Sequence, residues 1–73
     1  MKIKFSRHAK RQMKWRKISE NELRATVTNP DKLEDTIRGR KNAFKNMGGR
    51  LLKITYKPED DTLLIITALT KGE

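Results

Sequence analysis

The spacing of apolar residues along the chain changes twice, and the changes predict where helices and strands lie. Lys2 to Phe5 alternates charged and apolar side chains, as in a short half-buried strand. The next segment has the wider spacing of amphipathic helices, and the period returns to two from Asp31 onward. The pattern therefore predicts a short strand, a helical region and then a group of strands.

The first helix is predicted to follow Ser6, whose hydroxyl can accept a hydrogen bond from a free backbone N–H of the first turn. At about 100° per residue, one face of this helix carries Ala9, Gln12, Met13 and Arg16. His8, Arg11 and Trp15 lie beside one another on its flank. We expect this flank to lie at the border between core and solvent.

A second helix is predicted to begin after Ser19. Ser19 and Glu22 have the spacing of a capping box, and Ile18 and Leu23 have that of a hydrophobic staple. The helix should end at residues 29–30, Asn-Pro, because a residue before proline is pushed out of the helical region.

The first two strands after the helices have weaker signals. Leu33 and Ile37 fit one face of a strand that ends at residues 38–40, and residues 42–46 fit a second strand. Residues 48–49 are both glycine, and glycine adopts the positive φ angles of a tight hairpin without steric cost. We therefore expect a hairpin at this position.

The last two strands are predicted more clearly. Residues 50–57 form a strand with Leu52, Ile54 and Tyr56 on one side and Leu51, Lys53 and Thr55 on the other. After a turn at residues 58–61, the apolar run 62–70 is expected to be an interior strand with both faces covered. The fold class is therefore α+β, one domain over residues 1–73, with two N-terminal helices on one face of a three- to four-stranded antiparallel sheet.

Composition narrows the class of protein. The chain has 73 residues, a size at which a single core is only just sufficient, and it has no cysteine that could form a disulfide. One histidine without cysteine argues against a zinc site, and we expect no metal or other cofactor. No secretory signal or membrane-spanning run is present, so we expect a soluble, cytoplasmic protein without membrane contact.

The positive charge is segregated along the chain. The net charge is +9, residues 1–17 carry eight cationic side chains and no acidic one, and residues 38–57 carry seven and none. Two basic segments that converge in the fold would favour a polyanion, most often RNA or another nucleic acid. The alternative is a solvated basic surface without a specific partner.

The residue types support one kind of chemistry, metal-free cleavage of RNA by attack of the ribose 2′-hydroxyl on phosphate. This reaction needs a base, an acid and cations around the phosphate, and His8, Tyr56 and the basic residues could supply them. Each has a structural alternative. His8 could be a packing or surface residue, Trp15 could shield the edge of the core rather than stack on a base, and Tyr56 could be a core residue.

The chain resembles a small family, domain of unknown function 4258, whose first helix reads H-A-x-x-R-M-x-x-R-x-I-S. The matching residues are His8, Ala9, Met13, Arg16, Ile18 and Ser19 in the first part of the chain, with Arg38, Gly39, Arg40, Gly49, Arg50, Leu51, Ile54, Tyr56, Ile65, Ile66 and Thr67 later. The family is usually grouped with toxins of the RelE, ParE and BrnT kind, many of which cleave RNA without a metal. The resemblance therefore implies a RelE-like domain.

The resemblance also implies a site. His8 and Arg16, a cation such as Arg40, Lys45 or Arg50, and Tyr56 or Thr67 would surround one phosphate. Together with the pattern of the residues, this gives as candidate catalytic residues His8, Tyr56 and Thr67 and as candidate nucleic-acid ligands Arg11, Trp15, Arg16, Arg40, Lys45, Arg50 and Lys53. The family's arginine four residues after the histidine is Gln12 here. If that arginine neutralises the phosphate, this protein either has weakened activity or uses Arg11 or Arg16 in its place.

The leading hypothesis is a metal-independent ribonuclease of RelE-like toxin type, with His8 as proton carrier. The first alternative is a non-catalytic nucleic-acid-binding module whose affinity falls steeply with salt. The second is a protein-interaction domain whose basic face binds a small acidic antitoxin-like protein.

Overall fold

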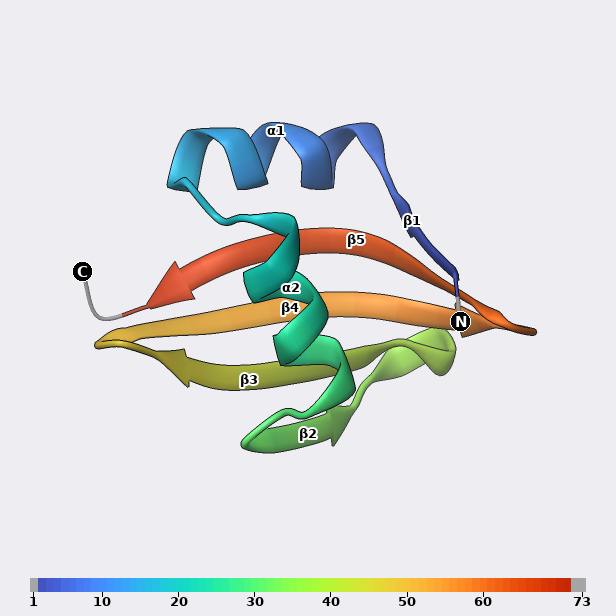
Figure 1. Ribbon diagram of the computed structural model, residues 1–73. Coiled ribbons are helices and arrows are strands. Elements are labelled where there is room, and N and C mark those ends of the chain that lie inside the picture. Colours follow the sequence, from blue (N-terminus) through green and yellow to red (C-terminus); the bar gives the residue numbers. More distant parts are fainter. Residues whose placement is uncertain (1, 72–73) are drawn as a thin grey trace.

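The computed structural model describes residues 2–71, which form two helices and five strands (Figure 1). The elements in chain order are β1 (Lys2–Phe5), α1 (Arg7–Arg16), α2 (Glu20–Thr28), β2 (Lys32–Asp35), the 3-10 turn η1 (Ile37–Gly39), β3 (Lys41–Met47), β4 (Arg50–Glu59) and β5 (Thr62–Lys71). The α+β class and the two N-terminal helices are as the sequence predicts.

The sheet differs from the prediction in its number of strands and in the direction of one of them. Its order is β1-β5-β4-β3-β2, and β1 pairs with β5 in parallel while all other pairs are antiparallel. The expected three- to four-stranded antiparallel sheet is therefore wrong. Alternation along a strand reports which side chains are buried, and it does not say which strand lies alongside or in which direction it runs.

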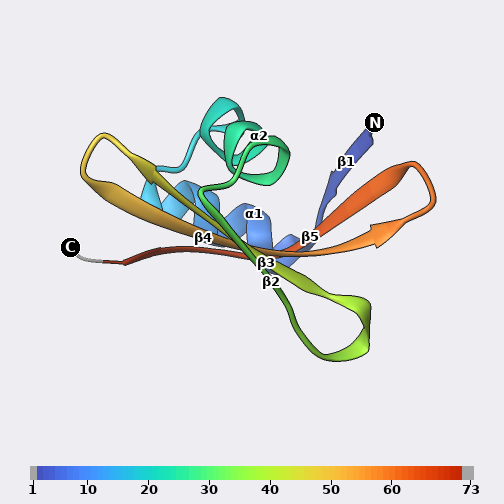
Figure 2. The ribbon, with the colours of Figure 1, turned by 90° about the horizontal axis from the view of Figure 1, so that it is seen from below.

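Both helices lie on one face of the sheet, and Figure 2 shows no helix on the other. Helix α1 packs mainly on β5, and α2 packs on β3 and β4. The buried core between the helices and the sheet consists of Ala9, Met13, Ile18, Leu23, Val27, Ala43, Leu52, Ile54, Tyr56, Ile65 and Ala68. These residues have the spacing that was predicted for α1, α2 and β4.

The local signals at the helix starts are confirmed. The Ser6 hydroxyl accepts a hydrogen bond from the Ala9 N–H at 3.0 Å. Ser19 and Glu22 form the complete capping box, in which each side chain accepts from the other residue's backbone N–H. These contacts need only residues three positions apart, so they form wherever the local sequence allows them.

The strand β5 has only one covered face, contrary to the prediction that both would be buried. Ile65 and Ala68 face the helices and are buried, whereas Leu64, Thr67 and Leu69 are half-exposed on the other side. Two helices of ten and nine residues are too few to cover both faces of a five-stranded sheet. We call the side of the sheet away from the helices the uncovered face.

The predicted strand through Leu33 and Ile37 is also shorter than expected. Strand β2 ends at Asp35, and the side chains of Leu33 and Ile37 are 48% and 71% exposed. The chain turns here because Arg38 and Gly39 adopt positive φ angles of 59° and 72°. The hairpin predicted at residues 48–49 is confirmed, with φ angles of 63° and 92°.

Candidate nucleic-acid interface

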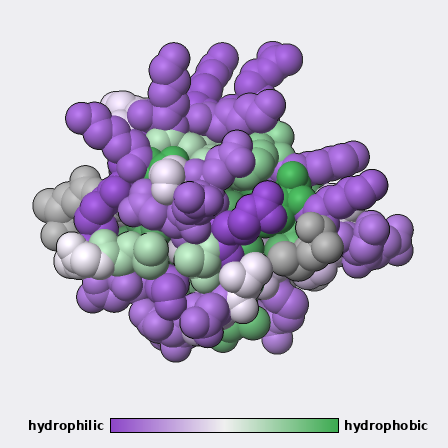
Figure 3. Space-filling view, in the orientation of Figure 1, coloured by the Kyte–Doolittle hydropathy of each residue, from purple (hydrophilic) through white to green (hydrophobic). Residues whose placement is uncertain are grey.

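Helix α1 carries three of the seven residues that the sequence proposed as nucleic-acid ligands, together with His8. Five of its ten side chains are cationic and none is acidic. His8, Arg11 and Trp15 are all exposed on one side of the helix, which we call the outer flank. In Figure 3, hydrophilic side chains project from the region of the surface where α1 lies.

Trp15 does not shield the core. Its side chain is 78% exposed, so the interpretation of Trp15 as a core-edge residue is wrong. The guanidinium carbon of Arg16 lies 5.3 Å from the centre of the Trp15 ring, a cation–π distance. The other side of the indole has no such partner among residues 2–71, and it offers a flat surface for stacking.

Gln12 fixes the position of this helix on the sheet. Beyond Phe5, β1 no longer pairs with β5, so the backbone groups on that edge of β5 need other partners. The Gln12 side-chain oxygen accepts a hydrogen bond from the Ala68 N–H at 2.9 Å, and the Ser6 hydroxyl donates to the Ile66 carbonyl at 3.1 Å. An arginine side chain has no acceptor, so the arginine of the family motif could not make this contact with the Ala68 N–H.

Replacing Gln12 with methionine is expected to lower the free energy of unfolding by about 1–2 kcal/mol, because it leaves the Ala68 N–H without an acceptor. The measurement is urea unfolding followed by circular dichroism. Gln12→Glu is the control, since it keeps an acceptor oxygen at the same distance along the side chain. A Gln12→Met variant as stable as the parent protein would contradict this role.

Tyr56 lies on the helix-covered face of β4 and is only 5% exposed, so its interpretation as a core residue is confirmed. Burial raises the pKa of its phenol, against the opposing effect of the nearby Lys41 ammonium. The phenol is therefore neutral at physiological pH. The structure places Tyr56 in the core and His8 on the surface, and it does not bring the two side chains together at one exposed site.

Thr67 and Lys53 lie on the uncovered face. Thr67 pairs with Thr55, and Lys53 pairs with Phe44 and Leu69 in the strands on either side. Both residues are far from α1 in the sequence, and their position on the uncovered face depends on strand register. The sequence alone therefore did not show this position. The sequence did not single out Phe44, although alternation within residues 42–46 puts it on the same side of β3 as two polar neighbours.

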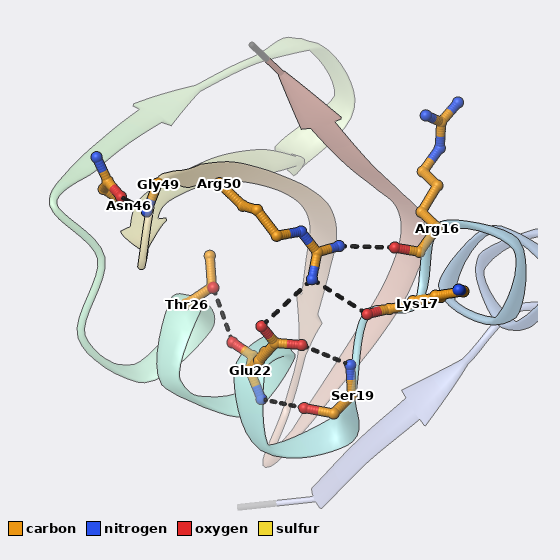
Figure 4. A network of polar contacts seen from close by, with 8 residues as sticks. All are labelled: Arg16, Lys17, Ser19, Glu22, Thr26, Asn46, Gly49 and Arg50. Atoms are coloured by element: carbon orange, nitrogen blue, oxygen red, sulfur yellow. Dashed lines mark hydrogen bonds and ion pairs between the residues drawn. The ribbon is translucent and has the colours of Figure 1, made fainter. Parts of the chain in front are cut away.

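Arg50 connects the start of β4 to the segment between the helices (Figure 4). Its guanidinium donates to the Arg16 carbonyl at 2.6 Å and to the Lys17 carbonyl at 3.2 Å, and it forms an ion pair with Glu22 at 3.5 Å. Both terminal nitrogens of Arg50 thus have partners within the protein. The predicted contact of Arg50 with phosphate stays a prediction, and a phosphate would have to compete with these three contacts for the guanidinium.

Lys45 and Arg40 differ in their surroundings. The Lys45 ammonium donates to the Asn29 carbonyl at 2.9 Å and lies 3.6 Å from the Asp31 carboxylate, so it closes the connection between α2 and β2. Arg40 follows η1 and is half-buried, and its side chain makes no hydrogen bond or ion pair within the described chain. Of these two side chains, Arg40 is the one that could bind a ligand without first breaking a contact within the described chain.

A shallow pocket of about 220 Å³ lies on the other side of α1, lined by Phe5, Lys10, Met13 and Glu20. None of the proposed site residues contributes to it. Across residues 2–71, no group of three or more histidine and acidic side chains could hold a metal ion. No helix in the same range is long and apolar enough to cross a membrane.

The fold and the charged surface define a small basic α+β domain, with two helices on one face of a mixed sheet. Residues 5–70 match the family described as Domain of unknown function (DUF4258), so the chain belongs to this family, as the motif around His8 predicted. No curated protein and no solved structure matches the chain significantly.

Proposed function

We propose that this protein binds single-stranded RNA through the outer flank of α1. The observation that carries the proposal is the exposure of the only tryptophan on a helix with five cationic and no acidic side chains. Cations bind the phosphates, and an exposed indole stacks on an unpaired base.

The geometry around Trp15 favours an unpaired base over a duplex. Arg16 covers one face of the indole, and a base on the opposite face would complete a stack of guanidinium, indole and base. Bases inside a duplex are already stacked on each other and cannot enter this arrangement. Arg11 lies one turn before Trp15 on the same flank, and in this arrangement its cation would bind the phosphate beside that base.

Trp15→Leu is expected to weaken the binding of a labelled single-stranded RNA by about 10-fold, because one stacked base contributes about 1–3 kcal/mol.

Arg11→Gln should reduce the slope of log affinity against log salt by about 0.7, which corresponds to one lost phosphate contact on a single strand. Fluorescence polarisation measures both quantities. The parent protein should also show quenching of Trp15 fluorescence when RNA is added.

The matched control is Arg24→Gln, which removes the same charge from the exposed side of α2. Equal weakening by Arg24→Gln and Arg11→Gln would mean that only net charge matters, and it would contradict the proposed interface. Absence of RNA binding, together with tight binding of a small acidic protein, would instead favour the protein-interaction alternative.

A second candidate function is metal-independent cleavage of the bound RNA, as in a toxin of RelE-like type. His8 favours it because it lies on the same exposed flank as Arg11 and Trp15 and makes no hydrogen bond within residues 2–71. Histidine can give and take a proton near neutrality. Its imidazole is therefore accessible to a phosphate that Arg11 holds.

In this reaction the 2′-oxygen loses its proton to a base and forms a bond to phosphorus, and the bond from phosphorus to the 5′-oxygen breaks. The 5′-oxygen takes a proton from an acid, which leaves a 2′,3′-cyclic phosphate and a 5′-hydroxyl. His8 would serve one of the two proton transfers, and a second group or water the other. Arginine and lysine side chains on the flank would stabilise the negative charge that develops on the phosphate.

A further inference from the structure

The uncovered face holds a second cluster of positive charge, centred on an aromatic ring. The ammonium groups of Lys71, Lys32 and Lys53 lie 5.6, 5.7 and 5.9 Å from the centre of the Phe44 ring. The three lysines come from β5, β2 and β4, so strands on both sides of β3 direct a cation towards one half-buried ring. We call these four residues the Phe44 cluster.

Two of the three lysines in the Phe44 cluster form no ion pair with a described acidic residue. Lys32 forms an ion pair with Glu34 at 3.2 Å, whereas Lys53 and Lys71 form none within residues 2–71. Like charges near one another raise the local positive potential and attract an anion. An anionic ligand that bridges Lys53 and Lys71 would relieve this repulsion.

A row of polar side chains lies next to the Phe44 cluster on the same face. Asn42, Thr55 and Thr67 occupy paired positions on β3, β4 and β5, and the Thr55 hydroxyl donates to the Asn42 side-chain oxygen at 2.7 Å. This row is two residues along the strands from Phe44, a separation of about 7 Å. The Asn42 amide group and the Thr67 hydroxyl are thus within reach of the edge of a base placed on the ring.

We propose that the Phe44 cluster binds one nucleotide of a single-stranded nucleic acid, with its base on the Phe44 ring and its phosphates on Lys53 and Lys71. The proposal rests on the proposed function only in taking nucleic acid as the partner, since the surface itself is a different one. It adds a base-binding position on the sheet to the one at Trp15 on α1.

The exchange of partners at the ring is energetically favourable. A base stacked on an aromatic side chain is bound more strongly than a single exposed ammonium over the same ring. A base therefore displaces an ammonium from the Phe44 ring, and the flexible lysine moves to a phosphate beside it. An acidic peptide would satisfy the lysines but would leave the ring without a stacking partner, so the cluster fits a nucleotide better.

The test is a titration of the protein with a short single-stranded DNA, followed by the chemical shifts of the backbone amides. Such DNA lacks the 2′-hydroxyl and so cannot be cleaved by the proposed reaction. We expect the largest shift changes at Phe44, Lys53 and Lys71 and at the row Asn42, Thr55 and Thr67, in addition to those on α1. A duplex of the same sequence should not produce the changes around Phe44.

Two variants test the individual contacts. Phe44→Leu is expected to weaken binding of the single strand by about 5- to 10-fold. The double variant Lys53→Gln, Lys71→Gln keeps the Phe44 ring and removes two charges on the uncovered face, so it tests the cluster even if Phe44→Leu folds poorly. It should reduce the salt slope by about 1.4, twice the value for one contact. Arg24→Gln, on the helix side, is the control for net charge.

The outcomes separate this inference from the proposed function. Shift changes confined to α1, with unchanged affinity of the Phe44 and lysine variants, would overturn the inference and leave RNA binding by α1 intact. Changes around Phe44 without changes on α1 would support the inference and contradict the proposed α1 interface. Changes around Phe44 with polyglutamate but not with DNA would assign the face to an acidic protein and overturn the inference.

Discussion

Replacing Arg50 with alanine is expected to lower the free energy of unfolding by about 2–3 kcal/mol. The change removes hydrogen bonds from a charged donor to two carbonyls and an ion pair with Glu22, and it leaves both carbonyls without their partner. The side chains of Arg50 and Glu22 are 29% and 25% exposed, so water screens part of the ion pair. For a domain of this size the total stability is on the order of 4–11 kcal/mol.

The control for Arg50→Ala is Arg40→Ala, which removes an arginine without any such contact in the described chain. Denaturant unfolding monitored by circular dichroism measures both variants, and Arg40→Ala should change stability by less than about 0.5 kcal/mol. Equal effects of the two substitutions would contradict the structural role of Arg50.

A second variant separates the ion pair of Arg50 with Glu22 from the hydrogen bonds of Arg50 to the two carbonyls. Glu22→Gln keeps a side-chain oxygen for the capping box but removes the charge opposite Arg50. We expect its effect to be smaller than that of Arg50→Ala, because the bonds to the Arg16 and Lys17 carbonyls remain. A double-mutant cycle of the two changes should show coupling, as residues in direct contact do.

Replacing His8 with alanine is expected to reduce RNA cleavage by about 10²- to 10⁴-fold, if the protein cleaves RNA as the second candidate function requires. This is the usual contribution of a side chain that transfers a proton in the rate-limiting step. The measurement is cleavage of a single-stranded RNA by purified protein in EDTA. The affinity for RNA should change little, because the proposed role of His8 is to transfer a proton and not to bind the phosphate.

Two controls accompany the His8 measurement. An RNA with a single 2′-deoxyribose at the cleavage position should bind and remain intact, because the attacking hydroxyl is missing. Arg11→Gln should weaken binding at the same flank, so it separates loss of affinity from loss of chemistry. Equal cleavage by His8→Ala and the parent protein, or cleavage that stops in EDTA, would remove this mechanism.

Local features of the structure were predictable because they depend on residues close in sequence. The capping box of Ser19 and Glu22 and the hairpin at residues 48–49 each need contacts within four positions. The side chains of Leu52 and Ile54 on β4 were assigned to the covered face because alternation has a fixed period of two. The helical spacing likewise separated Ala9 and Met13 from the exposed flank.

Other features were predicted wrongly or missed because they depend on how distant segments meet. Trp15 was interpreted first as a core-edge residue, since large aromatic side chains are usually at least partly buried. The helix leaves it exposed because α1 packs on β5 through the opposite side, where Ala9 and Met13 are buried. Similarly, the length and apolar character of β5 suggested burial on both faces, but residues 2–71 form only two short helices to cover the sheet.

The sequence by itself determined the class of this protein: a small basic α+β domain with two capped helices, a glycine hairpin and a family motif around His8. The tertiary structure decided which of its charges are free to bind a ligand. In the folded chain, Arg50 donates hydrogen bonds to carbonyls 33 and 34 positions away, and the Phe44 ring lies close to lysines from three strands. Periodicity gives the face of a residue within its own element, whereas strand order and register give its neighbours, and these depend on the packing of the whole chain.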